Sequence, residues 1–141
     1  MTTQLHDTGE EWYQTNIESV TYDVGLFNDS TDSLTDSSDL SDITTEPTDG
    51  NYSRLTGSNF ITLKSDGDWS LVNESQLSFD VTGTTGDVDS YFIVVNFQSE
   101  DAGDSSASDH LFATGDLSQS YALSNLDTLN LSQEGIGTSL T

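Results

Sequence analysis

Apolar residues recur along most of the chain in short alternating or continuous runs, and both patterns predict β-strands. Leu77, Phe79 and Val81 alternate with polar residues, which places them on one face of a strand. Residues 88–97 contain a continuous apolar run, so we expect Tyr91–Phe97 to form a central strand that is buried on both faces. The expected strands, in chain order, are 20–27, 60–64, 69–72, 77–81, 88–97, 111–112, 117–123 and 126–131.

The segments between these strands carry turn signals and acidic residues, and none of them predicts a helix of three turns. Asp66-Gly67 predicts a tight turn, and residues 99–109 predict a short acidic loop. Residues 28–51 predict a long acidic loop with one helical turn near residues 38–43. About eight short strands joined in this way are typical of an all-β fold, an antiparallel β-sandwich or a jelly-roll-like fold.

The net charge of −23 limits the conditions under which such a fold is stable. The chain has 25 acidic residues, and Arg54 and Lys64 are its only Arg and Lys. Repulsion among these acids opposes a compact state in dilute salt, whereas molar salt shortens the Debye length to about 3 Å and screens it. The chain is therefore either disordered or folded in concentrated salt, and its clustered aromatic residues favour the folded alternative. The composition resembles that of proteins from salt-accumulating halophiles, so we expect high salt to be required for stability.

The composition also restricts the partners of the chain. Hydrophobic residues make up 32% of it, so the core is thin and suits two packed sheets or a subunit completed by an oligomer. The acidic charge predicts no binding to nucleic acid or to anionic lipid. No run approaches 18 apolar residues, and residues 1–11 lack an apolar segment, so we expect neither a membrane span nor a signal peptide. The chain contains no Cys and therefore no disulfide.

Few residues suit catalysis, and one cluster suits a metal ion. His6 and His110 are the only histidines, and neither lies in a recognisable catalytic or metal-binding motif, so we expect no catalytic residues. Asp29, Asp32 and Asp36 recur every three or four residues in the long loop. Hard cations take several carboxylate oxygens, so these three are candidate ligands for Ca²⁺ or Mg²⁺. The alternative is a solvated acidic loop without metal.

Two further features concern how the chain is held together. Arg54 stands alone among acids, and it either pairs bidentately with a carboxylate to anchor a loop end or lies on the surface without a fixed partner. We expect residues 1–19 to form a polar N-terminal arm with three anchors and residues 20–141 to form a single β-sandwich domain. The arm is expected to dock onto a neighbouring subunit through Trp12, Tyr13 and Ile17.

Several short motifs resemble those of small β-sandwich virion structural proteins of tailed viruses. The motifs are Val24-Gly25-Leu26-Phe27-Asn28, the acidic linker from Asp39 to Pro47, Gly50-Asn51-Tyr52-Ser53-Arg54, Val88 to Val94, and Leu126-Asp127-Thr128-Leu129-Asn130-Leu131. Trp69 stands where the family has a polar and aromatic strand, and Asn125-Leu126 replaces a glycine of the closing strand. The resemblance covers most of the chain.

The resemblance implies a non-enzymatic virion protein. It implies a surface decoration or turret component of a capsid, here of a haloarchaeal tailed virus, with other virion proteins as partners. We expect a homo-oligomer, a pentamer or a trimer, made in the cytoplasm of a halophilic host and carried on the extracellular particle. The alternatives are a tail, baseplate or fibre component and a carbohydrate-binding adhesive β-sandwich. In the last case Trp12, Trp69 or Tyr52 would stack on sugar rings of a host-surface glycan.

Overall fold

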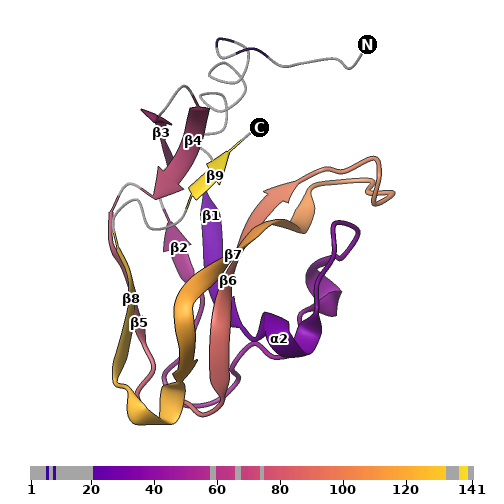
Figure 1. Ribbon diagram of the computed structural model, residues 1–141. Coiled ribbons are helices and arrows are strands. Elements are labelled where there is room, and N and C mark those ends of the chain that lie inside the picture. Colours follow the sequence, from indigo (N-terminus) through magenta and orange to yellow (C-terminus); the bar gives the residue numbers. More distant parts are fainter. Residues whose placement is uncertain are drawn as a thin grey trace.

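The computed structural model describes residues 6, 8, 21–57, 60–65, 68–73, 75–132 and 137–139, which Figure 1 shows as coloured ribbon. For residues 57, 60–65, 68–73 and 137–139 it describes the backbone alone. The three anchors of the predicted N-terminal arm, Trp12, Tyr13 and Ile17, lie outside the described residues.

The described chain is mostly β, with two antiparallel sheets of four and two strands. The four-stranded sheet has the order β2-β1-β6-β7, and the two-stranded sheet pairs β5 with β8. These strands are β1 (Tyr22–Phe27), β2 (Leu55–Gly57), β5 (Leu77–Asp80), β6 (Asp87–Phe97), β7 (Ser108–Ala122) and β8 (Thr128–Leu131). The prediction of a mostly β, antiparallel fold is therefore confirmed. Among the described residues the strands do not close into a barrel or a jelly roll.

Three further strands pair through their backbones. They are β3 (Phe60–Ser65), β4 (Asp68–Asn73) and β9 (Gly137–Ser139), in the order β3-β4-β9. Ser65 lies opposite Asp68 in the β3–β4 register, as the predicted turn at Asp66-Gly67 requires. The sequence pattern did not predict β9 or β2, because each has only three residues and neither shows an apolar repeat.

The inner face of the four-stranded sheet packs on the two-stranded sheet and forms the main core. Alternation decides which residues take part, since Phe79 of β5 is 1% exposed while its neighbours Ser78 and Asp80 are exposed. Cross-strand neighbours Val24 and Ile93 lie at the centre of this core and are fully buried. Its other buried members are Tyr22, Leu26, Val81, Val88, Tyr91, Val95, Leu123, Leu129 and Leu131.

The outer face of the same sheet carries a second, smaller core that the acidic loop covers. Phe27, Phe92 and Val94 are buried there, and the partly buried hydrophobics packed against them are Leu34, Leu40, Ile43 and Leu111. The loop contains a four-residue helix, α2 (Asp29–Asp32), and a 3₁₀ turn, η1 (Leu40–Asp42), which confirms the predicted helical turn near residues 38–43. Figure 1 shows α2 and the rest of the loop beside β6 and β7.

The prediction of a central strand buried on both faces is confirmed as far as Val95. Residues 91–95 of β6 are buried, with alternate side chains in the inner and outer cores. Phe97 is 42% exposed, so the prediction is wrong for the end of the strand. The reason is that β1 pairs with β6 only as far as Val95, which lies opposite Tyr22, and beyond this point β1 does not flank β6.

The prediction of two strands at residues 111–112 and 117–123 is also wrong, because β7 is one strand of 15 residues. The polar sequence Thr114-Gly115-Asp116 resembles a turn, yet Gly115 lies opposite Tyr91 and Asp116 opposite Ser90 in the β6–β7 register. A Cβ atom on Gly115 would lie 2.3 Å from the Tyr91 ring. The glycine therefore leaves space for the ring that lies across it, and it does not mark a turn. The chain leaves β7 through a 3₁₀ turn, η2 (Leu123–Asn125).

Candidate functional site

The carboxylates of the acidic loop hold the loop together. Asp32 accepts hydrogen bonds from the hydroxyls of Thr44 at 2.6 Å and Thr45 at 2.7 Å, and also from both of their backbone N–H groups. Burial raises the pKa of Asp32, but these hydrogen bonds outweigh it and leave the pKa below its ordinary value. Asp89 of β6 binds the first turn of α2 in the same way, accepting from the backbone N–H groups of Asp29 and Ser30. Each end of the loop is thus tied by an acid that accepts several donors.

The three candidate metal ligands have different surroundings. Asp29 accepts a hydrogen bond from the backbone N–H of Leu34 at 2.9 Å, Asp32 has the donors given above, and Asp36 is exposed. In the part of the chain that the structure describes, no group of three or more Asp, Glu, His or Cys residues is arranged to hold a metal ion. The hypothesis of a Ca²⁺ or Mg²⁺ site therefore stays a prediction that this geometry does not support.

Arg54 pairs bidentately with a carboxylate, which was one of the two alternatives that the sequence left open for it. Its Nε and Nη2 each donate to a different oxygen of Glu46, both at 2.8 Å, and its guanidinium lies 5.0 Å from the centroid of the Phe92 ring. The hydrogen bonds to Glu46 raise the pKa of Arg54. Glu46 lies near the end of the acidic loop and Phe92 lies in the outer core, so the ion pair joins the loop to the sheet.

Tyr52 completes this contact and is not available to stack on a sugar. Its hydroxyl donates to Glu46 Oε1 at 3.0 Å and accepts from the backbone N–H of Leu26 at 2.9 Å. Its ring is stacked on Phe79 with the centroids 6.0 Å apart, and burial raises the pKa of its hydroxyl. The prediction that Tyr52 serves as a glycan platform is therefore wrong, because both its ring face and its hydroxyl are used inside the fold. Trp12 lies outside the described residues, and only the backbone of Trp69 is described, within β4.

His110 lies in a cluster with Asp104 and Ser108 that contains the residue types of a hydrolytic triad but not the triad geometry. In a triad the serine and the carboxylate contact opposite nitrogens of the imidazole. Here Asp104 Oδ2 at 2.5 Å and Ser108 Oγ at 3.1 Å both contact Nε2, and Ser108 also donates to Asp104 at 3.0 Å. A serine bonded to the carboxylate itself has no imidazole relay to activate it.

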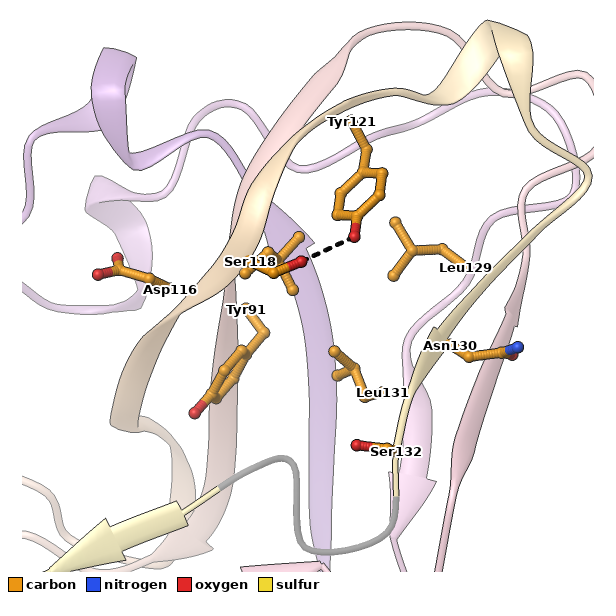
Figure 2. Close-up of a pocket in the computed structure, with 9 residues that line it drawn as sticks. Tyr91, Asp116, Ser118, Tyr121, Leu129, Asn130, Leu131 and Ser132 are labelled. Carbon is orange, nitrogen blue, oxygen red and sulfur yellow. Dashed lines mark hydrogen bonds between the residues drawn. The ribbon is translucent and has the colours of Figure 1, made fainter.

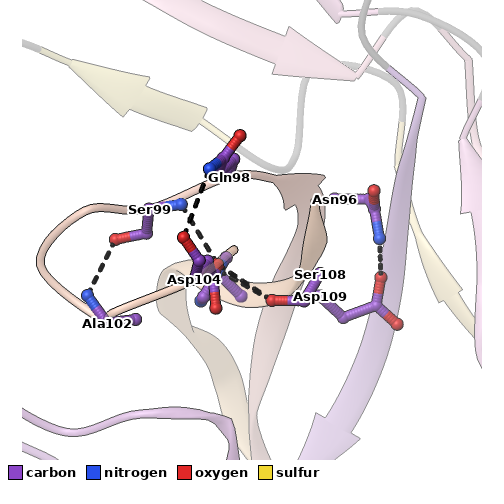
Figure 3. A network of polar contacts seen from close by, with 8 residues as sticks. Asn96, Gln98, Ser99, Ala102, Asp104, Ser108 and Asp109 are labelled. Carbon is purple, nitrogen blue, oxygen red and sulfur yellow. Dashed lines mark hydrogen bonds and ion pairs between the residues drawn. The ribbon is translucent and has the colours of Figure 1, made fainter. Parts of the chain in front are cut away.

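The same cluster closes the turn between β6 and β7 (Figure 3). Asp104 also accepts a hydrogen bond from the backbone N–H of Ser99 at 3.1 Å, which bridges the base of the turn. This bond and the contact with His110 lower the pKa of Asp104. Phe97 packs on the His110 ring with the centroids 4.7 Å apart. The cluster thus has a structural explanation in the hairpin.

A cavity of about 200 Å³ opens between β7 and β8 (Figure 2). Its floor consists of Tyr91, Leu129 and Leu131, which belong to the inner core and are 7%, 5% and 8% exposed. In Figure 2 the two leucines point from β8 toward β7, whereas Asn130 points away. The cavity therefore reaches the core of the protein from one side.

The β7 wall of this cavity is irregular. Asp116 pairs with Ser90 and Tyr121 pairs with Val88, so β7 has four residues between these pairs where β6 has one. Such a bulge bends a strand and leaves part of it outside the ladder. The hydroxyl groups of Ser118 and Tyr121 are 3.0 Å apart across the bend. We take this open side between β7 and β8 as the candidate functional site.

Sequence reasoning missed this site because its residues come from three strands and carry no motif. One signal was present, since Asp116 is the only charged residue between His110 and Leu126. Comparison with protein-family models, with curated proteins and with solved structures gives no match. No helix among the described residues is long and apolar enough to cross a membrane.

Proposed function

We propose that the chain is a non-enzymatic structural protein of a virion, a surface decoration or turret component on the capsid of a halophilic tailed virus. It assembles there as a homo-oligomer, a pentamer or a trimer, beside other virion proteins. The observation that carries the proposal is the open side between β7 and β8, where a cavity leads to buried core side chains in a chain with a net charge of −23. A free acidic monomer gains nothing from an open cavity beside its core, whereas a subunit fills such a cavity on assembly.

The contacts among the resemblance motifs support the virion assignment. Leu26 of the first motif bonds to Tyr52 of the third, and Tyr52 and Arg54 of that motif both bond to Glu46 of the acidic linker. Three motifs that are separated in the sequence thus form one hydrogen-bonded unit. A shared framework is expected to keep residues that contact one another. On this basis we also propose that the two sheets are parts of a β-sandwich of the virion-protein kind, open at one side.

The polar clusters support a structural rather than a catalytic role. The His110 cluster lacks a relay to its serine, and the acids of the long loop accept hydrogen bonds from the loop itself. Each cluster is explained by the segment it holds in place. The high acidity is explained by stability in brine, where hydrated carboxylates keep a particle surface soluble.

Two measurements test this function. Light scattering of the purified chain in about 2 M salt, where charges are screened, is expected to give the mass of a trimer or a pentamer. Quantitative gel analysis of virions from a halophilic tailed virus that encodes the chain is expected to find it in the capsid fraction at a fixed ratio to the major capsid protein. Presence in the tail fraction instead supports the tail or fibre alternative. A monomer that is absent from particles and binds a glycan when free would overturn the proposal.

A further inference from the structure

The open side has the geometry of a missing strand. In the described part of the chain β7 pairs only with β6, and β8 pairs only with β5, so both strands present an edge to the cavity. Long exposed edges are normally covered, because their unpaired N–H and C=O groups attract other strands. β7 is the longest described strand, and its bulged residues 117–120 have no partner on β6. An added strand would pair with this edge and cover Leu129 and Leu131 below it.

The charge distribution makes this edge approachable for another acidic chain. The acids number 25 in 141 residues, yet residues 117–126 contain none. Burial does not explain why the β7 part of this stretch lacks acids, because Ser118, Gln119 and Ser120 are exposed. Interface cores are depleted in charge, and like charges brought together across an interface cost free energy. Residues 117–122 are therefore a place where two copies can meet with little repulsion.

One segment of the chain matches the edge in length, charge and pattern. Residues 12–17, Trp-Tyr-Gln-Thr-Asn-Ile, are uncharged and lie between Glu11 and Glu18, outside the described residues. The segment is rich in the aromatic and β-branched residues that favour strands, and alternation puts Tyr13, Thr15 and Ile17 on one face. We propose that residues 12–17 of a second copy add as a strand along residues 117–122 of β7, with Tyr13 and Ile17 over the cavity. The inference rests on the proposed function only for the existence of a homo-oligomer.

The reach of the chain indicates a second copy. Ile17 precedes Tyr22 by five residues, which span at most about 18 Å when extended. Tyr22 lies opposite Val95 of β6, whereas the bulge of β7 lies opposite Asp89, six residues further along that strand. The added strand also lies three strand spacings from β1, so the separation is roughly 24 Å. Ile17 of the same copy therefore stops short of the bulge of β7, and Ile17 of a neighbour has no such limit.

Site-specific crosslinking tests the position of the segment, since the chain contains no Cys that would interfere. A Thr15→Cys chain and a Ser118→Cys chain with tags of different mass are mixed in about 2 M salt and treated with a short bismaleimide. We expect a crosslinked heterodimer from this mixture. The matched control pairs Thr15→Cys with Ser124→Cys, an exposed serine outside the cavity lining, and should give at most a tenth of the product. The double variant Thr15→Cys/Ser118→Cys should form chains of crosslinked subunits.

A charge placed on the edge tests its contribution to assembly. Ser118→Asp puts an acid in the uncharged strip at an exposed position, and we expect at least a tenfold weaker association by light scattering against concentration. Ser124→Asp makes the same change of charge outside the cavity and should leave association unchanged. An internal crosslink within monomers of the double variant would overturn the docking onto a second copy. An oligomer that forms without the Thr15–Ser118 crosslink would also overturn this docking, but it would leave the proposed function standing. A chain that is monomeric in all conditions would overturn both the docking and the proposed function.

Discussion

The two faces of the four-stranded sheet are covered in different ways, although the same strand, β6, supplies the centre of both. The inner face meets the apolar side chains of β5 and β8, and its core is built almost entirely from burial. The outer face meets residues 28–51, which contain seven acids and only three apolar side chains that reach the sheet: Leu34, Leu40 and Ile43. The outer cover therefore depends on hydrogen bonds to carboxylates and on one ion pair, in addition to its small apolar contact. The comparison shows that an acidic segment can close a core when its acids accept donors from the segment itself.

The largest effects should follow a charge placed under either cover. Ile93 faces the inner core and Val94 the outer core, and they are 0% and 3% exposed. We expect Ile93→Asp and Val94→Asp each to abolish the cooperative transition in about 2 M salt, because a buried unpaired charge costs several kcal/mol. Thr114→Asp, on an exposed position of β7, is the control and should melt like the parent. Parent-like melting of Val94→Asp alone would mean that the loop is not a true cover.

Salt should separate the two faces next. Lowering the salt from about 2 M to about 50 mM lengthens the Debye length from roughly 2–3 Å to more than 10 Å. Repulsion among the seven acids of the loop then grows, so hydrogen exchange should show loss of protection in residues 28–51 at higher salt than in β6. The whole fold should be lost at the low end, which circular dichroism would record. A flat profile down to about 50 mM would contradict the salt requirement.

Two glycines allow a matched test of packing on the two faces. A Cβ atom on Gly25 would lie 2.3 Å from the Phe92 ring in the outer core, and one on Gly115 would lie 2.3 Å from the Tyr91 ring beside the cavity. Gly25→Ala should cost about 1–3 kcal/mol of unfolding free energy, because Phe92 is fully buried and has no space to move. Gly115→Ala should cost less than about 1 kcal/mol, because the cavity of about 200 Å³ gives Tyr91 room. Equal costs in denaturant titrations would show that the open side is not open in solution.

The ion pair of the outer cover should have an intermediate effect. Arg54 and Glu46 have side chains that are 33% and 22% exposed, so the pair is neither buried nor free in solvent. We expect Arg54→Lys to lower the unfolding free energy by about 1–2 kcal/mol, since lysine keeps the charge but not the bidentate geometry. A double-mutant cycle with Glu46→Gln measures the coupling free energy between the two residues. A coupling near zero would mean that the apolar contacts alone hold the loop.

The smallest effect should come from the pH dependence of a single loop acid. The pKa of Asp32 is lower in the folded chain than its ordinary value of about 3.9. Its contribution is therefore complete above that ordinary value and is lost as the pH falls through the lower folded value. Asp32→Asn should cost on the order of 1 kcal/mol at neutral pH, and it should flatten the decline of stability between about pH 4 and pH 2. An unchanged acid slope would show that Thr44 and Thr45 do not favour the charged form.

The sequence by itself determined the features that depend on local pattern and on total charge. The alternation at Phe79 identified the buried face of β5, and the apolar run identified β6 as the central strand. A net charge of −23 predicts that the fold needs concentrated salt, because repulsion depends on composition before it depends on arrangement. The sequence allowed two hypotheses for Arg54, and a bidentate pair with a carboxylate was one of them.

Only the tertiary structure decided which partners met. It selected Glu46 among 25 acids for Arg54, and it placed Tyr52 against Phe79 instead of in solvent. It joined residues 108–122 into one strand, because these residues pair with β6 and Gly115 lies under the Tyr91 ring instead of in a turn. It also left the side between β7 and β8 open, a feature that no single strand contains. Contacts between distant segments depend on register and packing, and a local pattern does not specify either of them.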